Sequence, residues 1–427
     1  MRILCIGSRG PAVQLLQLAL NRSGFGPLET DGLFGAATRG ALARFQAVNK
    51  LTVDGVAGPR THQALLPWYT GYTLHTLLRG ETFWALGQRY GVSAEAVALA
   101  NPELEAQRLP VGARVVVPLP FPVVPTGIDY CASLVGYCVQ GLSARYPFLR
   151  SGQLGQSALG RPLWTLTAGQ GDTRVLYNAE HHANEWITTT LLLHFAEELA
   201  AAFASGSSLQ GQSAAELFSR ATLCLVPAVN PDGMDLVTGE LQEGPAFDPA
   251  RRIARDYPRF PFPSGWKANL RGVDLNLQYP AGWEQARAIK FAQGVVSPAP
   301  ADFVGDAPLS APEARALYSF TLRFDPELIL AFHTQGEVIY WRYLDYEPPN
   351  SRQIAAYFAA LSGYAVEETP YASGFAGYKD WFIQEYNRPG YTIEAGQGVN
   401  PLPISDFDAI YPRIEGILTA GMLVSDA

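Results

Sequence analysis

Two histidines and two glutamates follow apolar runs of this sequence, and their types and spacing are suited to holding a metal ion. His182 and Glu185 come directly after RVLYNAE (174–180), His333 follows LILAF, and Glu394 ends GYTIE. A spacing of three residues on a turn that enters a helix places His182 and Glu185 on one face. Catalytic zinc usually takes three protein ligands and leaves one position for water. With only six histidines in the chain, the pattern predicts one Zn²⁺ ion held by His182, Glu185 and His333.

Short apolar runs separated by helical stretches must position these side chains. The runs are β-rich and do not alternate with polar residues, as expected of strands buried on both faces. They are RVLYNAE (174–180), ATLCLVPAVN (221–230), LILAFHT (328–334) and GYTIEA (390–395). Because helical stretches such as 187–204 lie between them, we predict an α/β sheet covered by helices. Such sheets bind ligands at the carboxyl ends of their strands.

Five motifs between residues 125 and 425 carry a resemblance to a known family. In chain order they are HANEWIT, VNPDG, WKANLRGVDLN, FHTQGE and YTIEAG. They resemble the zinc carboxypeptidases, whose fold is a mixed, mainly parallel eight-stranded sheet flanked by helices. The resemblance implies that His182, Glu185 and His333 bind zinc and that Glu394 is the general base. Zinc can lower the pKa of a bound water to about 7 and polarise a carbonyl, while a carboxylate takes the water's proton.

The resemblance also implies supporting roles for two further residues. Asp274, in Gly-Val-Asp-Leu-Asn, matches the family carboxylate that orients the first zinc histidine and fixes its tautomer; an Asx turn or helix cap is the alternative. Lys267 stands beside Trp266 at the position of the family's oxyanion arginine, where it would act as a point charge. Arg271 is a competing cation nearby.

The chain departs from the digestive members of the family at one substrate-binding position. Those enzymes grip the free C-terminal carboxylate of a peptide with an arginine, but this sequence reads Asn276-Leu277-Gln278. Leucine cannot form a bidentate pair with a carboxylate. The sequence therefore argues against strict removal of C-terminal residues, although Asn276 can still bind substrate.

Three residues before the last active-site strand are candidate substrate contacts. Tyr371 precedes Ala-Ser-Gly, as the mobile-loop tyrosine of the family does, and it is our first choice. Tyr378 is a rival because the loop is one residue longer than expected. Lys379 stands where the family sets side-chain preference, so it could meet an acidic substrate group such as a diaminopimelate carboxylate. The alternative for Lys379 is a surface lysine.

Residues 1–68 show a repeated turn between helical stretches. The turns read DGLFGAAT (31–38) and DGVAGPRT (54–61), with Asp-Gly suited to a tight turn and threonine able to cap the next helix. Together with the FQ between them, they resemble the peptidoglycan-binding type 1 domain, a three-helix module that binds cell walls. A generic helical bundle is the alternative.

Residues 71–119 follow a different pattern of strand, helix, helix and strand. The segment GETFWALGQRYGVS (80–93), a later Asn-Pro and a closing VVVP resemble the LysM domain, a βααβ module that binds the N-acetylglucosamine backbone of peptidoglycan or chitin. We expect Trp84 and Tyr90 in its core. The proline-rich stretch 119–126 is a stiff linker, which assigns residues 120–427 to the zinc peptidase domain.

Composition restricts the partners and the location of the protein. A formal net charge of -8 argues against nucleic acid as the main partner, and no run reaches the ~18 apolar residues of a membrane span. The apolar run among the first residues is too short for a secretory leader. This leaves a wall-associated role and a cytoplasmic or spore-recycling role open.

Four cysteines are too few for a disulfide scaffold, although Cys131 and Cys138 could pair. We expect the irregular stretch 235–270 to wall one side of the cleft.

These features favour a zinc peptidase that two wall-binding modules hold on peptidoglycan, with stem peptides as substrate. The run around Leu277 resembles the γ-D-glutamyl-L-diamino acid endopeptidases, which cut between the γ-carboxyl of D-glutamate and diaminopimelate or lysine. One alternative is a carboxypeptidase that trims stem peptides, for which Arg271 or Arg342 would have to reach the site. Another is a peptidoglycan-binding protein without catalysis. The preferred diamino acid and the oligomeric state stay open.

Overall fold

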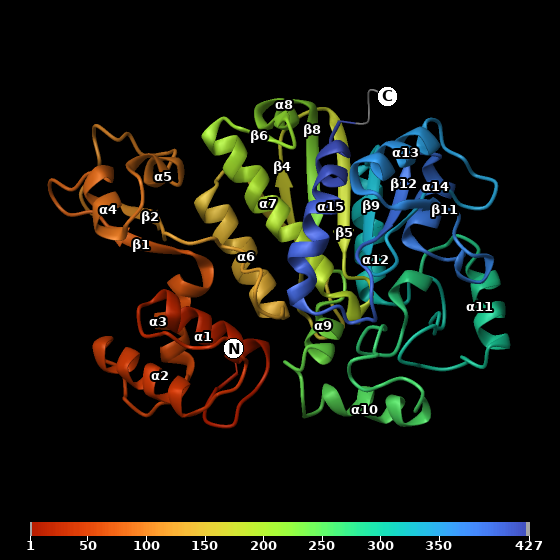
Figure 1. Cartoon of the computed structure of the whole chain (residues 1–427), viewed down its shortest axis with the longest axis horizontal. Helices are drawn as coiled ribbons and strands as arrows, with labels where there is room; N and C mark the ends of the chain where they lie inside the picture. Colours follow the sequence, from red (N-terminus) through yellow and green to blue (C-terminus); the bar gives the residue numbers. More distant parts are fainter. Residues whose placement is uncertain (1, 424–427) are drawn as a thin grey trace. The chain divides into compact units, whose positions relative to one another are not determined.

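The computed structural model describes residues 2–423, which form two compact units (Figure 1). The first unit contains the chain up to Asp129 together with Ser133–Ser151. The second contains Tyr130–Ala132 and the chain from Gly152 onward. Cys131 and Cys138, which could have formed a disulfide, are both buried and are not joined to each other.

The N-terminal part of the first unit consists of three helices, α1 (Pro11–Arg22), α2 (Ala36–Val48) and α3 (Pro59–Thr70). Each Asp-Gly turn is held by a buried glutamine from the helix before it. Gln17 donates from Nε2 to Asp31 Oδ1 at 2.7 Å and to Thr38 Oγ1 at 3.2 Å. The second turn repeats these bonds through Gln46, Asp54 and Thr61.

The expectation that threonine caps the next helix was wrong. The N-caps of α2 and α3 are Gly35 and Gly58, without a side-chain hydrogen bond. Thr38 and Thr61 lie inside the first turn of their helices, where the hydroxyl accepts the glutamine amide instead. The sequence repeat is thus a repeat of one buried hydrogen-bond network.

The second part of this unit is a two-stranded sheet with two helices. Strand β1 (Tyr72–Thr76) pairs antiparallel with β2 (Arg114–Pro118), and α4 (Phe83–Tyr90) and α5 (Ala94–Leu99) lie between them in the chain. Thr82 and Ser93 cap these helices through their hydroxyls. The core contains Leu77, Phe83, Leu86, Val97, Val115 and Val117.

Trp84 does not belong to this core, contrary to expectation. Its side chain is 66% exposed, because Phe83 and Leu86 occupy the inward face of α4 and their neighbour turns outward. Tyr90 packs against the core from its edge. The chain continues through α6 (Ala132–Arg145).

An eight-stranded mixed sheet forms the centre of the second unit, as predicted. The strand order is β11-β10-β12-β9-β5-β8-β4-β3. Neighbours β8, β5, β9 and β12 are parallel, whereas β10 and β4 run antiparallel to β12 and β8. The strands are β3 (Arg150–Gln156), β4 (Pro162–Ala168), β5 (Thr173–Ala179), β8 (Ala221–Val226), β9 (Leu328–His333), β10 (Val338–Tyr340), β11 (Ala365–Glu367) and β12 (Gly390–Glu394).

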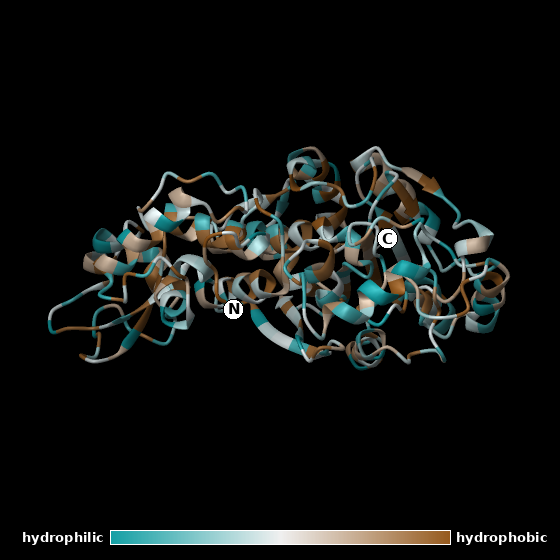
Figure 2. Ribbon diagram, turned by 90° about the horizontal axis from the view of Figure 1, so that it is seen from below, coloured by the Kyte–Doolittle hydropathy of each residue, from teal (hydrophilic) through white to brown (hydrophobic). Residues whose placement is uncertain are grey.

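Helices cover both faces of this sheet. Leu176 and Ile329 pack into a cluster with side chains of α12 and α14 on one face. On the other face, Tyr177 donates a 2.9 Å hydrogen bond to the carbonyl oxygen of Leu418 in α15, which packs on α7 (Figure 1). Figure 2 shows hydrophobic and hydrophilic segments alternating along the helices. The helices of the second unit, whether or not they cover the sheet, are α7 (Ile187–Ser205), α8 (Ala214–Arg220), α9 (Pro231–Val237), α10 (Phe247–Asp256), α11 (Trp283–Ala292), α12 (Pro312–Phe324), α13 (Ser351–Ser362), α14 (Tyr378–Tyr386) and α15 (Phe407–Ala420).

Helix α7 is the one helix within residues 2–423 that is long and apolar enough to cross a membrane. Most of it, 72% of the apolar window, is buried inside the second unit. Its apolar surface is therefore used as the core of the α/β sandwich. A short hairpin of β6 (Ser208–Leu209) and β7 (Gln212–Ser213) follows it.

The buried glutamine network gives a stability prediction for the N-terminal module. Replacing Gln46 by leucine leaves the buried amide of Gly55 without its 2.9 Å acceptor, which should cost about 1–3 kcal/mol. Hydrogen exchange at Gly55 should become faster in Gln46→Leu, whereas Gln63→Leu, at an exposed position of α3, should leave it unchanged. Equal exchange in both variants would contradict a stabilising role for the network.

Candidate active site

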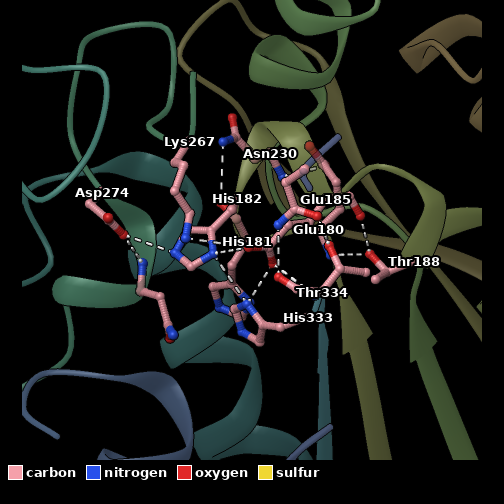
Figure 3. A network of polar contacts seen from close by, with 12 residues as sticks. Glu180, His181, His182, Glu185, Thr188, Asn230, Lys267, Asp274, His333 and Thr334 are labelled. Carbon is pink, nitrogen blue, oxygen red and sulfur yellow. Dashed lines mark hydrogen bonds and ion pairs between the residues drawn. The ribbon is translucent and has the colours of Figure 1, made fainter. Parts of the chain in front are cut away.

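Three side chains converge at the carboxyl ends of β5 and β9 (Figure 3). His182 has an extended backbone, and the 3₁₀ turn Ala183–Glu185 then returns Glu185 toward it. His182 Nδ1 lies 2.9 Å from Glu185 Oε1, and His333 Nδ1 lies 2.8 Å from Glu185 Oε2. The potential ligand atoms of all three residues lie within 4.8 Å of one another. The predicted trio is therefore assembled around one point.

The chemistry of this donor set fits a divalent cation. The two Nδ1 atoms face each other at 3.2 Å, so their lone pairs need a proton or a cation between them. Burial lowers the pKa of His182, but the carboxylates of Glu185 and Asp274 outweigh it and raise the value to about 9. Burial favours the neutral form of Glu185, yet His182, Lys267 and His333 hold its pKa well below the usual range. Two imidazoles and one ionised carboxylate are ligands that zinc prefers.

Asp274 supports the ring of His182 from the side away from Glu185 (Figure 3). His182 Nε2 donates to Asp274 Oδ1 at 3.2 Å, and the amide of Asp302 donates to Oδ2 at 3.1 Å. Asp274 also caps the short turn Leu275–Leu277 by accepting from Asn276 N. One carboxylate thus contacts the imidazole and closes an Asx turn. Burial by itself would raise the pKa of Asp274. The charge of His182 and its hydrogen bond together have a larger effect, so this pKa lies below its ordinary value.

Glu394 and Lys267 flank the trio. Glu394 ends β12 directly opposite His333 in the parallel register, and burial raises the pKa of its carboxyl group. Lys267 Nζ lies 3.4 Å from Glu185 Oε1. Arg271, its predicted competitor, is exposed and is not among the residues that line the cavity.

A cavity of about 260 Å³ opens beside the trio. Asn276 and Leu277 line it, and Asn276 Oδ1 accepts a 3.0 Å hydrogen bond from the amide of Tyr378. This bond fixes the start of α14 against the segment that carries Asp274. The lining residues are His182, Lys267, Asp274, Asn276, Leu277, Lys290, Asp302, His333, Tyr340, Thr369, Pro370, Ser373, Gly377, Lys379, Asp380, Thr392 and Glu394.

The structure separates the two candidate tyrosines. Tyr378 is fully buried, and its hydroxyl bonds Thr321 Oγ1 at 2.8 Å within the core. Tyr371 is 65% exposed and lines a second cavity of about 410 Å³. This second cavity shares Thr369 and Asp380 with the first. Tyr371 is therefore the tyrosine that a substrate can reach.

Some residues of the cavity carried no sequence signal. Lys290, in the last turn of α11, is 7% exposed, and its Nζ lies 2.7 Å from Asp302 Oδ1. His181, next to the trio, stacks on the ring of His333 with centroids 5.6 Å apart.

The prediction that residues 235–270 wall the cleft was largely wrong. Part of this stretch forms α10, and Lys267 is its one residue among those that line the cavity.

Comparison with known proteins agrees with this geometry. The zinc carboxypeptidase profile matches residues 137–411, which is more than half of the chain. The chain belongs to the zinc carboxypeptidase family. It is therefore a metallopeptidase. Two further profiles match the first unit: a putative peptidoglycan binding domain at residues 9–65 and a LysM domain at 75–118. The boundaries proposed between these domains stay predictions.

Relatives narrow the position of the chain within the family. It is 43% identical over 297 residues to gamma-D-glutamyl-L-diamino acid endopeptidase 1 of Lysinibacillus sphaericus, an alignment that covers 69% of this chain and 72% of the relative. It is 42% identical over 276 residues to the uncharacterized protein YqgT of Bacillus subtilis, covering 64% and 72%. The fold is similar to carboxypeptidase A from Helicoverpa armigera, with a TM-score of 0.53 and 19% identity over 78% of this chain and 80% of that one.

The contact between Asp274 and His182 predicts an effect on metal affinity. In Asp274→Asn the cap of Asn276 can persist, but the imidazole loses its anionic acceptor. We expect zinc affinity to fall about 10- to 100-fold, measured by competition with a chromophoric chelator. Asp306→Asn, in an exposed part of the same loop region, is the control. Unchanged affinity in a folded Asp274→Asn protein would rule out the orienting role.

Proposed function

We propose that this chain hydrolyses the γ-D-glutamyl–diamino acid bond of peptidoglycan stem peptides, with one zinc ion held by His182, Glu185 and His333. The observation that carries the proposal is the replacement of a carboxylate-binding arginine by Leu277 in the cavity wall. No arginine occurs among the residues between 2 and 423 that line this cavity. A substrate that is cut inside its chain has no terminal carboxylate beside the scissile bond, so it needs no arginine at the position of Leu277.

The side chains around the cavity can divide the chemistry of amide hydrolysis among them. Zinc bound by the trio would supply Lewis-acid activation of water and of the scissile carbonyl. Glu394 would accept the proton of the attacking water and deliver it to the leaving amine. The raised pKa of Glu394 suits this exchange. A group that must take up a proton and release it again works best when its pKa lies near the operating pH. The ammonium of Lys267 would stabilise the developing oxyanion.

The carboxypeptidase alternative lacks a suitable arginine. Arg342 Nη1 and Nη2 are engaged by Glu347 at 2.6 Å and Glu368 at 2.7 Å, and Arg342 lines the second cavity only. Arg271 is exposed outside the first cavity. Neither arginine offers a free guanidinium to a terminal carboxylate beside the trio.

The two N-terminal modules support a cell-wall substrate. Their profiles describe peptidoglycan-binding and LysM domains, and the relative from Lysinibacillus sphaericus is named for the same bond. A module that binds the wall raises the local concentration of stem peptides around the catalytic unit. Peptidoglycan strands and stem peptides are thus the partners that we propose.

Product analysis tests the position of the cut. The zinc-loaded protein is incubated with the stem tetrapeptide L-Ala-γ-D-Glu-diaminopimelyl-D-Ala, and products are identified by mass spectrometry. We expect release of L-Ala-D-Glu, and its loss when a chelator removes the metal. Release of a single terminal alanine would instead show carboxypeptidase activity.

The base assignment predicts the behaviour of Glu394→Gln. The amide has nearly the same shape but cannot accept the proton, so kcat should fall by about 100- to 10,000-fold. Zinc content should stay at that of the unsubstituted protein, because Glu394 is not one of the three converging residues. Glu367→Gln, at an exposed position of the edge strand β11, should retain full activity. A Glu394→Gln protein that retains its zinc and full activity would contradict the assignment.

A further inference from the structure

Helix α10 and the turn that follows it carry a concentration of positive charge that the proposed chemistry does not use. The stretch RRIARDYPR (251–259) contains four arginines and one aspartate, in a chain whose formal net charge is -8. All four arginines are exposed. None of them lines the active-site cavity, so they are not contacts of a stem peptide that is bound there.

Three of these arginines have no carboxylate partner in the part of the chain that the structure describes. Arg251 pairs with Asp248 at 2.9 Å. No ion pair within residues 2–423 joins Arg252, Arg255 or Arg259 to an acidic side chain. A guanidinium group presents a planar fork of donors that matches a phosphate group with two hydrogen bonds. We call these three unpaired residues the arginine surface.

The backbone arranges the arginine surface along one line. Arg252 and Arg255 are three residues apart on α10, which separates them by about 4.5 Å along the helix axis and places them on one face. Arg259 follows in the next turn of chain, where its guanidinium carbon lies 4.9 Å from the centroid of the Phe260 ring. Asp256, the one aspartate of the stretch, is exposed and pairs with none of the three. The line therefore presents repeated positive charge to the solvent.

The inner face of α10 fixes this line near the catalytic centre. Ala250 and Ala254 are buried, and Ile253 Cδ1 lies 3.2 Å from the position that a Cβ atom would take at Gly272. Gly272 precedes Asp274 by two residues, so the helix packs on the segment that supports the first zinc histidine. In Figure 1, α10 lies at the lower edge of the second unit, the edge at which α9 follows β8.

We propose that the arginine surface binds an anionic polymer of the bacterial cell wall whose charges are phosphodiester groups repeated along a flexible chain. The polymer lies along α10, and successive phosphates contact successive arginines. This gives the catalytic unit an attachment of its own to the wall, in addition to the two N-terminal modules. Two attachments on one chain raise the local concentration of each at its ligand. The choice of a wall polymer rests on the proposed function, because a stem-peptide hydrolase works where such polymers are attached.

The charges and side chains around the arginine surface favour this occupant over a nucleic acid. A stiff duplex is wide and would also meet the surface around α10, in a chain whose net charge of -8 repels phosphates. A single nucleic-acid strand gains much of its affinity by stacking bases on aromatic rings. The rings next to the arginines, those of Phe247, Phe260 and Phe262, are only partly exposed. A slender polymer without bases needs only the row of cations.

Binding to a soluble polymer tests the proposal. The zinc-loaded full chain is titrated with fluorescently labelled poly(glycerol phosphate), and binding is followed by fluorescence anisotropy at several salt concentrations. The triple variant Arg252→Gln/Arg255→Gln/Arg259→Gln should bind at least about 10-fold more weakly at low salt. Its slope of log K against log salt concentration should be smaller by about 2, because three phosphate contacts with a single chain are lost.

A second triple variant controls for the loss of charge. Arg315→Gln/Arg323→Gln/Arg352→Gln removes the same charge from exposed positions on α12 and α13. Because salt screens charges that are distant from the binding surface, polymer affinity should change by less than about twofold. A single-stranded oligonucleotide with the same number of phosphates distinguishes the two sources of phosphodiester groups. We expect it to bind more weakly than poly(glycerol phosphate).

The tetrapeptide assay keeps this inference separate from the proposed function. Hydrolysis of the soluble stem tetrapeptide should be equal in the unsubstituted protein and both triple variants, because none of the six arginines lines the cavity. Equal hydrolysis also shows that the variants are folded. If the tetrapeptide is cleaved at the γ-D-glutamyl bond but polymer affinity is the same with and without the arginine surface, only the inference is overturned.

Two further results would overturn it. Equal weakening in both triple variants would show a general attraction between charges, and tighter binding of the oligonucleotide would assign the surface to nucleic acid. Absence of cleavage at the γ-D-glutamyl bond would instead refute the proposed function, while polymer binding that depends on the three arginines would still support the surface.

Discussion

A carboxylate buried between two imidazoles is the interaction on which the catalytic unit depends. Glu185 is 1% exposed and contacts His182 and His333 with both of its oxygens. Such an arrangement is unfavourable unless charge is balanced locally, since burial alone disfavours every ionised form. The parallel pairing of β5, β9 and β12 fixes the strand ends from which these side chains and Glu394 emerge. The sheet therefore imposes a dense set of charges that a bound cation would neutralise.

Further charged side chains surround this cluster. Asp274 accepts from the far nitrogen of His182, while Lys267 lies 3.4 Å from Glu185. Further along the cavity wall, lysines are paired with aspartates at 2.7 Å for Lys290 and 2.5 Å for Lys379. The wall thus alternates in charge, which suits a substrate that carries both signs. The stem peptides that we propose as substrates carry both signs.

Much of the site could be predicted from the sequence, because its chemistry is concentrated in short motifs. His182 and Glu185 are three residues apart, and His333 and Glu394 end apolar runs that were predicted to be buried strands. Lys290 and Asp302 gave no such signal, because each is an ordinary residue of a helix or loop until α11 packs beside the cavity. The tyrosines Tyr371 and Tyr378 could not be separated, since their roles depend on which one α14 turns into the core.

The sequence by itself determined the family, the sheet with its covering helices, and the trio of candidate ligands, because motif spacing and apolar periodicity are local properties of the chain. Burial and contact across the chain were decided only by tertiary structure. Packing exposes Trp84 although its position in the motif suggested a core residue. Packing also buries Lys379 beside Asp380 in the wall of the active-site cavity, although the sequence left a surface lysine open as the alternative. The reason is physical: a side chain's solvation and partners depend on segments far away in sequence, which no local pattern records.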